Sequence, residues 1–312
     1  MSLIDRQTNG VYIIAATPFA EDGALDTASI QRLTDFYLSK GVNGMTVLGV
    51  MGEAPKLTPE ESRLAAKTFL DAAQVPVIVG VSGAGLGTMT DFTKHVMDLG
   101  AAGVMVAPPP SLKTEVAVKA YYAAVCAAFG PDIPLVFQDY PQLTGVHVSA
   151  ATILELTRDH PQIVMLKHED CPGLPKLSAV RDGSDTAEIP RISILCGNGG
   201  LYLPQEMQRG ADGAMTGFAF PELLVGVVAQ SLAGNPEAAE DLFDAYLPVI
   251  KHEQQPGIGL ALRKRTLLKR GAIASDAIRA PGPRLSPKDA AELDALLARL
   301  DRRLGALGMA AE

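Results

Sequence analysis

Short apolar runs alternate with longer amphipathic stretches along most of the chain. Eight runs rich in Val, Ile and Leu have the length of buried strands, and the stretches between them have the length and apolar spacing of helices. The predicted strands span residues 11–15, 44–48, 75–79, 103–106, 133–137, 163–166, 192–195 and 213–216. The predicted helices include residues 27–40, 59–73, 88–99, 114–129, 150–159 and 201–209.

This alternation predicts an α/β fold with a parallel sheet. Continuous apolar strands separated by helices are typical of sheets covered on both faces, and eight repeats close into a TIM (β/α)8 barrel. An open doubly wound sheet is the alternative. It is disfavoured because no strand is followed by GxGxxG, and the glycine-rich run 80–87 lacks both that spacing and an acidic residue at the expected distance.

The strand pattern stops after residue 220, and helices are predicted over the rest of the chain. The last of them starts at Ser286-Pro287, a capping residue followed by proline in the first turn. We therefore expect a catalytic barrel over residues 1–220 and a C-terminal helical extension over 221–312. The helices expected in the extension span 223–233, 237–254, 260–269 and 287–304.

Composition and charge narrow the functional classes. The 312 residues are 47% hydrophobic and 20% charged, enough for one large core. The net charge is -8 and the basic residues are scattered, which argues against nucleic acid as a partner. No positively charged leader with an apolar run and no run of 18 apolar residues is found, so a cytoplasmic enzyme without a membrane partner is expected. Cys126, Cys171 and Cys196 are widely spaced and predict neither a disulfide framework nor a zinc site.

Active sites of such barrels lie where the strands end, and three clusters follow apolar runs at these positions. In the first, Lys167 ends the strand predicted at 163–166 and is followed by His168, Glu169 and Asp170. A lysine at the edge of an apolar barrel mouth can attack a carbonyl as a neutral amine, and the resulting imine permits aldol chemistry or dehydration. For a lysine considered alone, the alternative is that it caps the strand end in contact with solvent and has no chemical role.

The other two clusters are candidate binding elements. Gly49-Val50-Met51-Gly52-Glu53 follows the second predicted strand, and the amides of Val50 and Met51 could hold a substrate carboxylate. An ordinary tight turn is the alternative. The third cluster follows the fifth predicted strand and could bind hydroxyls or relay protons. It consists of Gln138, Asp139 and Tyr140.

Together these motifs resemble the dihydrodipicolinate synthase and N-acetylneuraminate lyase superfamily over nearly the whole chain. Residues 10–19 are similar to the opening strand that leads into Thr-Pro-Phe, and 49–61 to the carboxylate loop and its next helix. Lys167 matches the Schiff-base lysine, and 210–217 looks like the eighth-strand motif. The resemblance implies a lyase that acts on a 2-keto acid through Lys167, needs no cofactor, and forms a homo-oligomer, often a tetramer.

Departures from the family pattern narrow the expected activity. Val50 and Met51 stand where the synthases carry two hydroxyl residues, and residues 108–111 replace the segment with the tyrosine that reaches a neighbouring subunit. Gln142 follows Pro141, so the arginine that would bind a second substrate carboxylate is absent. Dihydrodipicolinate synthase activity is therefore not expected.

The remaining site residues point to a related branch. Gln138 occupies the place of the family's fifth-strand tyrosine, and the resemblance makes Tyr140, the nearest tyrosine, the candidate for its catalytic role. Glu169, two residues after Lys167 on an extended segment, should face the same way and is a candidate acid or base. This pattern is similar to that of sugar-acid dehydratases, particularly 2-keto-3-deoxypentonate dehydratases. A pyruvate-releasing aldolase and a non-catalytic keto-acid-binding barrel are the alternatives.

A metal-dependent aldolase is a further rival for the same fold. The five histidines show no spacing with carboxylates that suits a divalent cation, so no metal site is predicted. His168 flanks the lysine, but strand alternation would turn it away from the mouth. The histidines are His95, His147, His160, His168 and His252.

Overall fold

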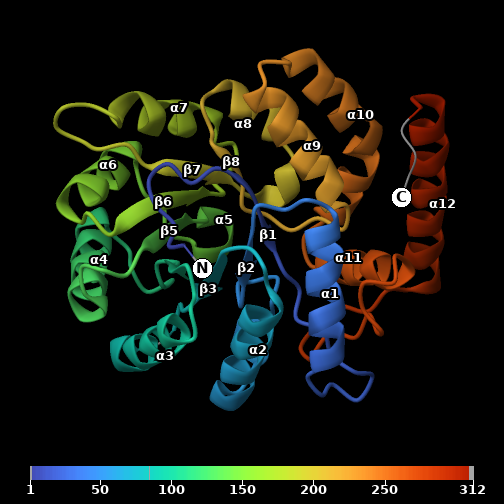
Figure 1. Ribbon diagram of the computed structural model, residues 1–312, viewed down its shortest axis with the longest axis horizontal. Helices are drawn as coiled ribbons and strands as arrows, with labels where there is room; N and C mark the ends of the chain where they lie inside the picture. Colours follow the sequence, from blue (N-terminus) through green and yellow to red (C-terminus); the bar gives the residue numbers. More distant parts are fainter. Residues whose placement is uncertain (1, 84, 309–312) are drawn as a thin grey trace.

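A computed structural model describes residues 2–83 and 85–308. Eight parallel strands pair in chain order, and β8 pairs with β1 to close a barrel (Figure 1). The predicted TIM barrel is therefore confirmed, and the open sheet is excluded. The strands are β1 (Gly10–Ile14), β2 (Gly44–Val47), β3 (Val77–Gly80), β4 (Gly103–Val106), β5 (Leu135–Asp139), β6 (Ile163–His168), β7 (Ser193–Cys196) and β8 (Gly213–Ala214).

Two strands begin two residues later than the apolar pattern indicates. β3 and β5 each start just after a proline, Pro76 and Pro134. Proline has no N–H to donate to a neighbouring strand, although its carbonyl can still accept. The two carbonyls accept hydrogen bonds from the amides of Met45 and Val104. Each proline therefore marks the boundary of its strand.

Side chains alternate between the inside of the barrel and the layer under the helices. One cluster of buried residues fills the inside, and it includes Val136 of β5 and Met165 of β6. A larger cluster fills the layer between strands and helices, and it includes Phe137 and Leu166. Because successive strand residues point to opposite faces, the side chain two places after Met165 also points inward. That side chain is Lys167.

Helices surround the strands in Figure 1. Their residues correspond to the predicted amphipathic stretches, with two additions that the sequence pattern did not predict, α5 and α7. No helix in the described part of the chain is long and apolar enough to cross a membrane. The helices are α1 (Thr27–Ser39), α2 (Pro59–Ala72), α3 (Leu86–Asp98), α4 (Glu115–Phe129), α5 (Pro141–Thr144), α6 (Ala150–Asp159), α7 (Leu174–Gly183) and α8 (Leu203–Gln208), with short 3-10 turns at Ala54–Lys56 and Asn198–Gly200.

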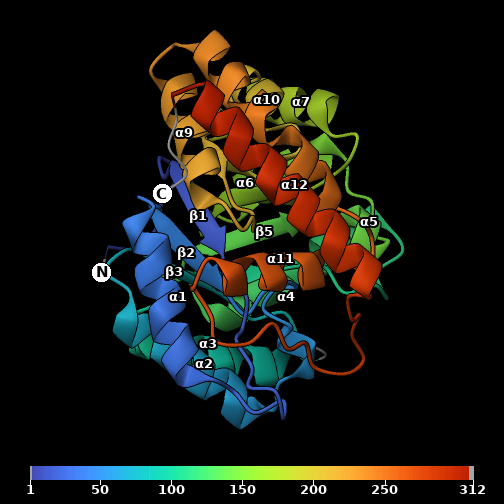
Figure 2. The same cartoon turned by 90° about the vertical axis from the view of Figure 1, so that its right-hand side faces the viewer.

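Four further helices follow β8. They are α9 (Pro221–Leu232), α10 (Pro236–Glu253), α11 (Gly259–Lys269) and α12 (Pro287–Ala306). The first of them, α9, contacts β1 and β8, as a helix of the barrel layer does. Figure 2 shows α11 and α12 on one side of the molecule. The Ser286 side chain accepts from the Asp289 amide as a helix cap, and the domain division at residue 220 stays a prediction.

Candidate active site

Lys167 and Glu169 form a buried ion pair inside the barrel mouth. Lys167 Nζ lies 3.0 Å from Glu169 Oε2, and the two side chains are 4% and 8% exposed. The strand continues as an extended segment past the lysine, so the two side chains point the same way. A lysine that attacks a carbonyl needs a nearby group to move protons, and this carboxylate lies within hydrogen-bond reach of its nitrogen.

Two side-chain amides hold Glu169 in place. Gln138 Nε2 donates to Glu169 Oε2 over 2.7 Å, and Gln138 pairs in register with Lys167 across β5 and β6. Asn198 Nδ2 donates to the carbonyl of Glu169 over 3.0 Å. A buried carboxylate that accepts from both an ammonium and an amide has a fixed orientation. Asn198 was not among the residues singled out from the sequence, because it lies in the 3-10 turn after β7 and its contact with Glu169 leaves no local signal.

A glycine at the end of β7 makes room for the Glu169 side chain. A Cβ atom on Gly197 would lie 2.1 Å from Glu169 Cγ and 2.7 Å from Oε1, far inside normal contact distance. Any side chain at this position would therefore displace the carboxylate from the lysine.

Gly197→Ala is expected to lower turnover of the keto acid substrate by about 10²-fold, because a displacement of about 1 Å in a catalytic group has effects of this size. Gly305→Ala is the matched control, since a Cβ there meets nothing within 4 Å. Steady-state kinetics and thermal unfolding of both variants would test this. Equal turnover in the two variants would contradict the role assigned to Gly197.

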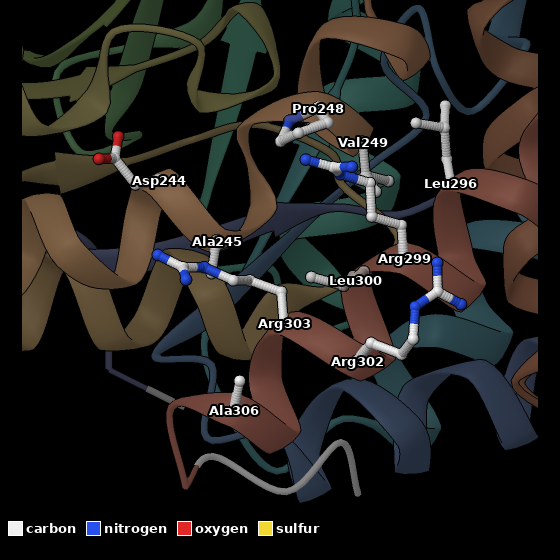
Figure 3. A pocket seen from close by; sticks show the side chains of 10 residues that line it. All are labelled: Asp244, Ala245, Pro248, Val249, Leu296, Arg299, Leu300, Arg302, Arg303 and Ala306. Carbon is white, nitrogen blue, oxygen red and sulfur yellow. The ribbon is translucent and has the colours of Figure 1, made fainter.

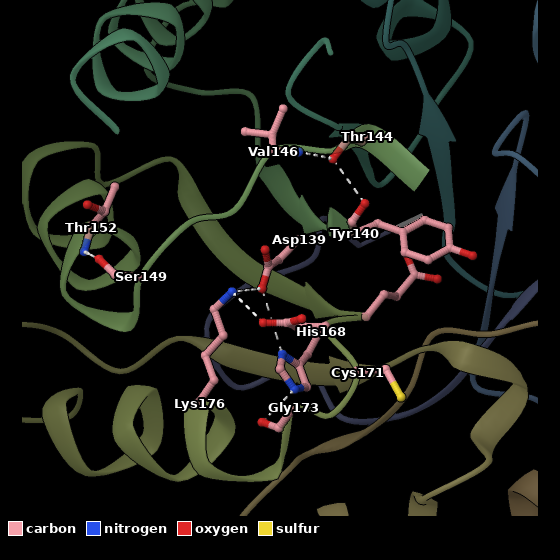
Figure 4. Close-up of polar contacts among 12 residues, drawn as sticks. Asp139, Tyr140, Thr144, Val146, Ser149, Thr152, His168, Cys171, Gly173 and Lys176 are labelled. Atoms are coloured by element: carbon pink, nitrogen blue, oxygen red, sulfur yellow. Dashed lines mark hydrogen bonds and ion pairs between the residues drawn. The ribbon is translucent and has the colours of Figure 1, made fainter. Parts of the chain in front are cut away.

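Asp139 does not join this group. It follows Gln138 on β5, so its side chain lies on the opposite face of the strand. Its Oδ2 lies 2.6 Å from Lys176 Nζ on α7 and 4.0 Å from His168 Nδ1. Figure 4 shows the Asp139 carboxylate directed toward Lys176 and His168, with the Tyr140 ring directed elsewhere. Burial raises the pKa of Asp139 to about 6. The sequence-based assignment of Asp139 to substrate binding overlooked this alternation.

Tyr140 lies on the same side as Gln138, two residues further along the chain. Burial is the main cause that raises the pKa of its phenol, the Glu169 carboxylate raises it further, and the Arg263 guanidinium lowers it. The phenol is thus within electrostatic range of both charged groups. It keeps its proton near neutral pH and can act as a hydrogen-bond donor.

The glycine-rich loop after β2 presents two free amides. Leu48 has φ 56°, a left-handed conformation that is uncommon for a side chain of this kind. A Cβ on Gly80 would lie 2.4 Å from the carbonyl oxygen of Leu48, so the neighbouring strand end must be a glycine. Neither the Val50 nor the Met51 amide donates to another residue in the described chain. These amides therefore remain candidates for binding an anion.

The C-terminal extension fixes the end of this loop. Glu53, which closes the loop, is buried and accepts from Lys264 Nζ over 2.7 Å, from Lys56 Nζ over 2.8 Å and from the Arg279 amide over 3.2 Å. Lys264 on α11 is fully buried, and burial lowers its pKa. Removing one partner of a buried pair costs about 3–5 kcal/mol, so this contact holds the loop to the extension. Contacts between residues 211 positions apart leave no local signal in the sequence.

A cavity of about 970 Å³ opens at the ends of β2 to β5. Gly49 and Val50 of the loop line it, and so does Gln138, which connects it to the ion pair. A second hollow of about 300 Å³ lies between α10 and α12. Arginines, apolar residues and Asp244 line that hollow, as Figure 3 shows, and none of the predicted site residues does. The first cavity is therefore the one that serves the barrel mouth.

Comparison with known proteins identifies the family. Residues 7–300 match the model of the dihydrodipicolinate synthetase family. The chain belongs to this family. The resemblance stated from its motifs is thus confirmed, and so is its class, a lyase of the dihydrodipicolinate synthetase family. This family forms Schiff bases with keto acids, the chemistry for which Lys167 was singled out.

Individual relatives in the dihydrodipicolinate synthetase family differ in their named activities. The chain is 32% identical over 299 residues to the L-2-keto-3-deoxyarabonate dehydratase of Azospirillum brasilense, covering 94% of each protein. It is 33% identical over 233 residues to a 4-hydroxy-tetrahydrodipicolinate synthase of Thermus thermophilus, covering 72% of the chain and 75% of that protein. A crystal structure of dihydrodipicolinate synthase from Rhodopseudomonas palustris is 47% identical, with a TM-score of 0.94 over 96% of this chain and 100% of that one.

Proposed function

We propose that this protein is a Schiff-base dehydratase of 2-keto-3-deoxy sugar acids, of the 2-keto-3-deoxypentonate type. The observation that carries the proposal is the Glu169 carboxylate 3.0 Å from Lys167 Nζ, held there by Gln138. A dehydratase of this kind must take a proton from the carbon next to the imine and lose a hydroxyl as water. A carboxylate beside the imine nitrogen suits both proton transfers.

The proposed reaction begins with imine formation. Lys167 Nζ attacks the C2 carbonyl of the keto acid, and the carbonyl oxygen leaves as water. The amides of Val50 and Met51 bind the C1 carboxylate, because two free amides in a tight loop form an anion site. The substrate then lies across the barrel mouth, with its C2 carbonyl at Lys167.

Proton transfers at C3 and C4 follow. The positive iminium withdraws electrons from C3, and Glu169 removes a C3 proton to give the enamine. The C4 hydroxyl then leaves with a proton from Glu169, so that one water molecule is lost and the carboxylate is restored. Tyr140 keeps its proton near neutral pH and donates a hydrogen bond to a substrate oxygen.

The departures from the synthase pattern support dehydration over condensation with a second substrate. Gln142 stands where the synthase arginine would bind a second carboxylate, and its amide donates to the carbonyl of Cys171 over 2.6 Å. The dehydratase relative from Azospirillum brasilense matches 94% of this chain. The 47% identity to a structure titled dihydrodipicolinate synthase makes condensation the reaction to test against.

Substrate profiling tests the proposal. The protein is incubated with 2-keto-3-deoxypentonate epimers, and separately with pyruvate plus aspartate semialdehyde. The proposal expects a dehydrated semialdehyde from at least one epimer and no condensation product. Release of pyruvate from the sugar acid would instead identify an aldolase. Condensation of pyruvate with aspartate semialdehyde, without turnover of the sugar acid, would identify a synthase.

Activity is expected to be unchanged in excess EDTA. The imine supplies the electron sink that a metal-dependent aldolase obtains from a divalent cation. Turnover with and without the chelator would be compared after prolonged incubation. Loss of activity that a divalent metal restores would contradict the imine mechanism.

A homo-oligomer is part of the proposal, since the family resemblance implies one. Light scattering coupled to size exclusion would measure the mass in solution. A monomer at all concentrations would contradict this part alone.

A further inference from the structure

An arginine from the C-terminal extension reaches the barrel mouth. Arg263 lies on α11 and is only 4% exposed. Its Nε donates to Glu253 Oε1 at the end of α10, and both side chains are buried. Buried charges of this kind are costly unless paired, so the pair fixes the direction of the guanidinium. Neither Arg263 nor Glu253 has a part in the chemistry described above.

The outer end of Arg263 is directed at the ends of the strands. A Cβ on Gly217, just after β8, would lie 2.7 Å from Arg263 Nη1 and 3.1 Å from Met51 Sδ. Gly217 therefore leaves the space into which the guanidinium extends, beside the loop that presents the carboxylate amides. Met51 also packs against the cluster that fills the barrel. These contacts place Nη1 at the inner wall of the mouth.

The terminal nitrogens of Arg263 are unused. Among the residues that the structure describes, only the Nε of Arg263 has a hydrogen-bond acceptor. The guanidinium also lies in electrostatic range of the Tyr140 phenol, whose pKa it lowers, and Glu169 acts on the same phenol. Arg263 and Glu169 thus both lie within electrostatic range of the Tyr140 phenol. A nearly buried guanidinium with free donors beside Gly217 and Met51 is suited to a ligand with hydrogen-bond acceptors.

We propose that Arg263 is a substrate-binding residue that holds the distal hydroxyl groups of the keto acid and thereby selects hydroxylated substrates. This inference rests on the proposed function, since it assigns the far end of the same substrate. Arg263 and Glu253 together are net neutral. They supply directed N–H donors without an uncompensated positive charge, which suits neutral hydroxyls better than a second carboxylate.

The test measures imine formation with four 2-keto acids. Pyruvate, 2-oxopentanoate, 2-oxoglutarate and 2-keto-3-deoxypentonate are titrated against the wild-type protein and Arg263→Met, and the adduct trapped by borohydride is quantified by intact mass. Intact and dehydrated adducts are summed, so turnover does not affect the readout. We compare one ratio between the proteins. It is the half-saturating concentration of 2-keto-3-deoxypentonate divided by that of 2-oxopentanoate. We expect Arg263→Met to raise this ratio by about 10- to 100-fold, the effect of hydrogen bonds to a charged donor.

Two further variants make the result decisive. Arg265→Met removes an arginine of the same helix that pairs instead with Asp276 at 3.2 Å, and it should leave the ratio at the wild-type value. Glu253→Gln/Arg263→Met removes both charges, so it reports on the hydroxyl contact if the single variant does not fold.

The inference would be overturned if Arg263→Met left the ratio unchanged, which includes the case in which binding of 2-keto-3-deoxypentonate and of 2-oxopentanoate weakens equally. Greater weakening of 2-oxoglutarate would overturn it in favour of a second carboxylate. Absence of any adduct on the wild-type protein would instead overturn the proposed function.

Discussion

Lys167→Ala is expected to lower turnover of the sugar acid by at least about 10³-fold, since the nucleophile of a covalent mechanism has no substitute. The borohydride-trapped adduct should disappear as well. Lys167 is the only lysine that the structure places beside Glu169, Gln138 and the barrel mouth in the described residues. Turnover by the variant at more than a tenth of the wild-type rate would contradict the imine mechanism.

Loss of folding must be separated from loss of the nucleophile. Lys167→Ala leaves Glu169 buried without its cation, which is destabilising by about 3–5 kcal/mol. The double variant Lys167→Ala/Glu169→Gln has no unpaired buried charge and should unfold at a higher temperature than the single variant. Both should be inactive. Lys119→Ala, which removes an exposed lysine paired with Glu155, is the matched control and should keep full activity.

Glu169→Gln is expected to lower kcat by about 10²- to 10⁴-fold, the range for loss of a general acid or base. The amide keeps the shape of the side chain but cannot accept a proton. The lysine remains, so pyruvate should still be trapped on Lys167. Steady-state kinetics on the sugar acid and intact mass after reduction with pyruvate measure the two effects. Loss of turnover without loss of the adduct distinguishes proton transfer from imine formation.

Asp139→Asn provides a contrast at the end of the neighbouring strand. Asp139 lies on the outer face of β5 beside Lys176, so its replacement should lower kcat by less than about tenfold. If Asp139→Asn lowered kcat as much as Glu169→Gln, the assignment of the proton-transfer role to the inner face would be contradicted.

Most of the fold could be predicted because its signals are local. The eight apolar runs correspond to the eight strands of the barrel, and the strand-end position of Lys167 followed from the same pattern. Helix α7 was missed because it follows Gly173 and buries only Leu177 and Val180, which leaves a weak amphipathic signal. The four residues of α5 are too few for a periodic pattern.

The site could be predicted only as far as strand geometry reaches. The spacing of Lys167 and Glu169 predicted that they face the same way, and the structure brings them within 3.0 Å. The same alternation, applied to Gln138, would have turned Asp139 outward. Arg263 and Lys264 could not be found this way, because they lie on α11, and only the packing of the extension determines which residues of the barrel and its loops they contact.

The central claim is that Lys167 forms an imine with a 2-keto acid. The most direct measurement is reduction with borohydride in the presence of pyruvate or a 2-keto-3-deoxy sugar acid, followed by intact and peptide mass analysis. The proposed mechanism predicts one adduct per chain, on the peptide that contains Lys167. An adduct on another lysine, or no adduct with any 2-keto acid, would contradict it.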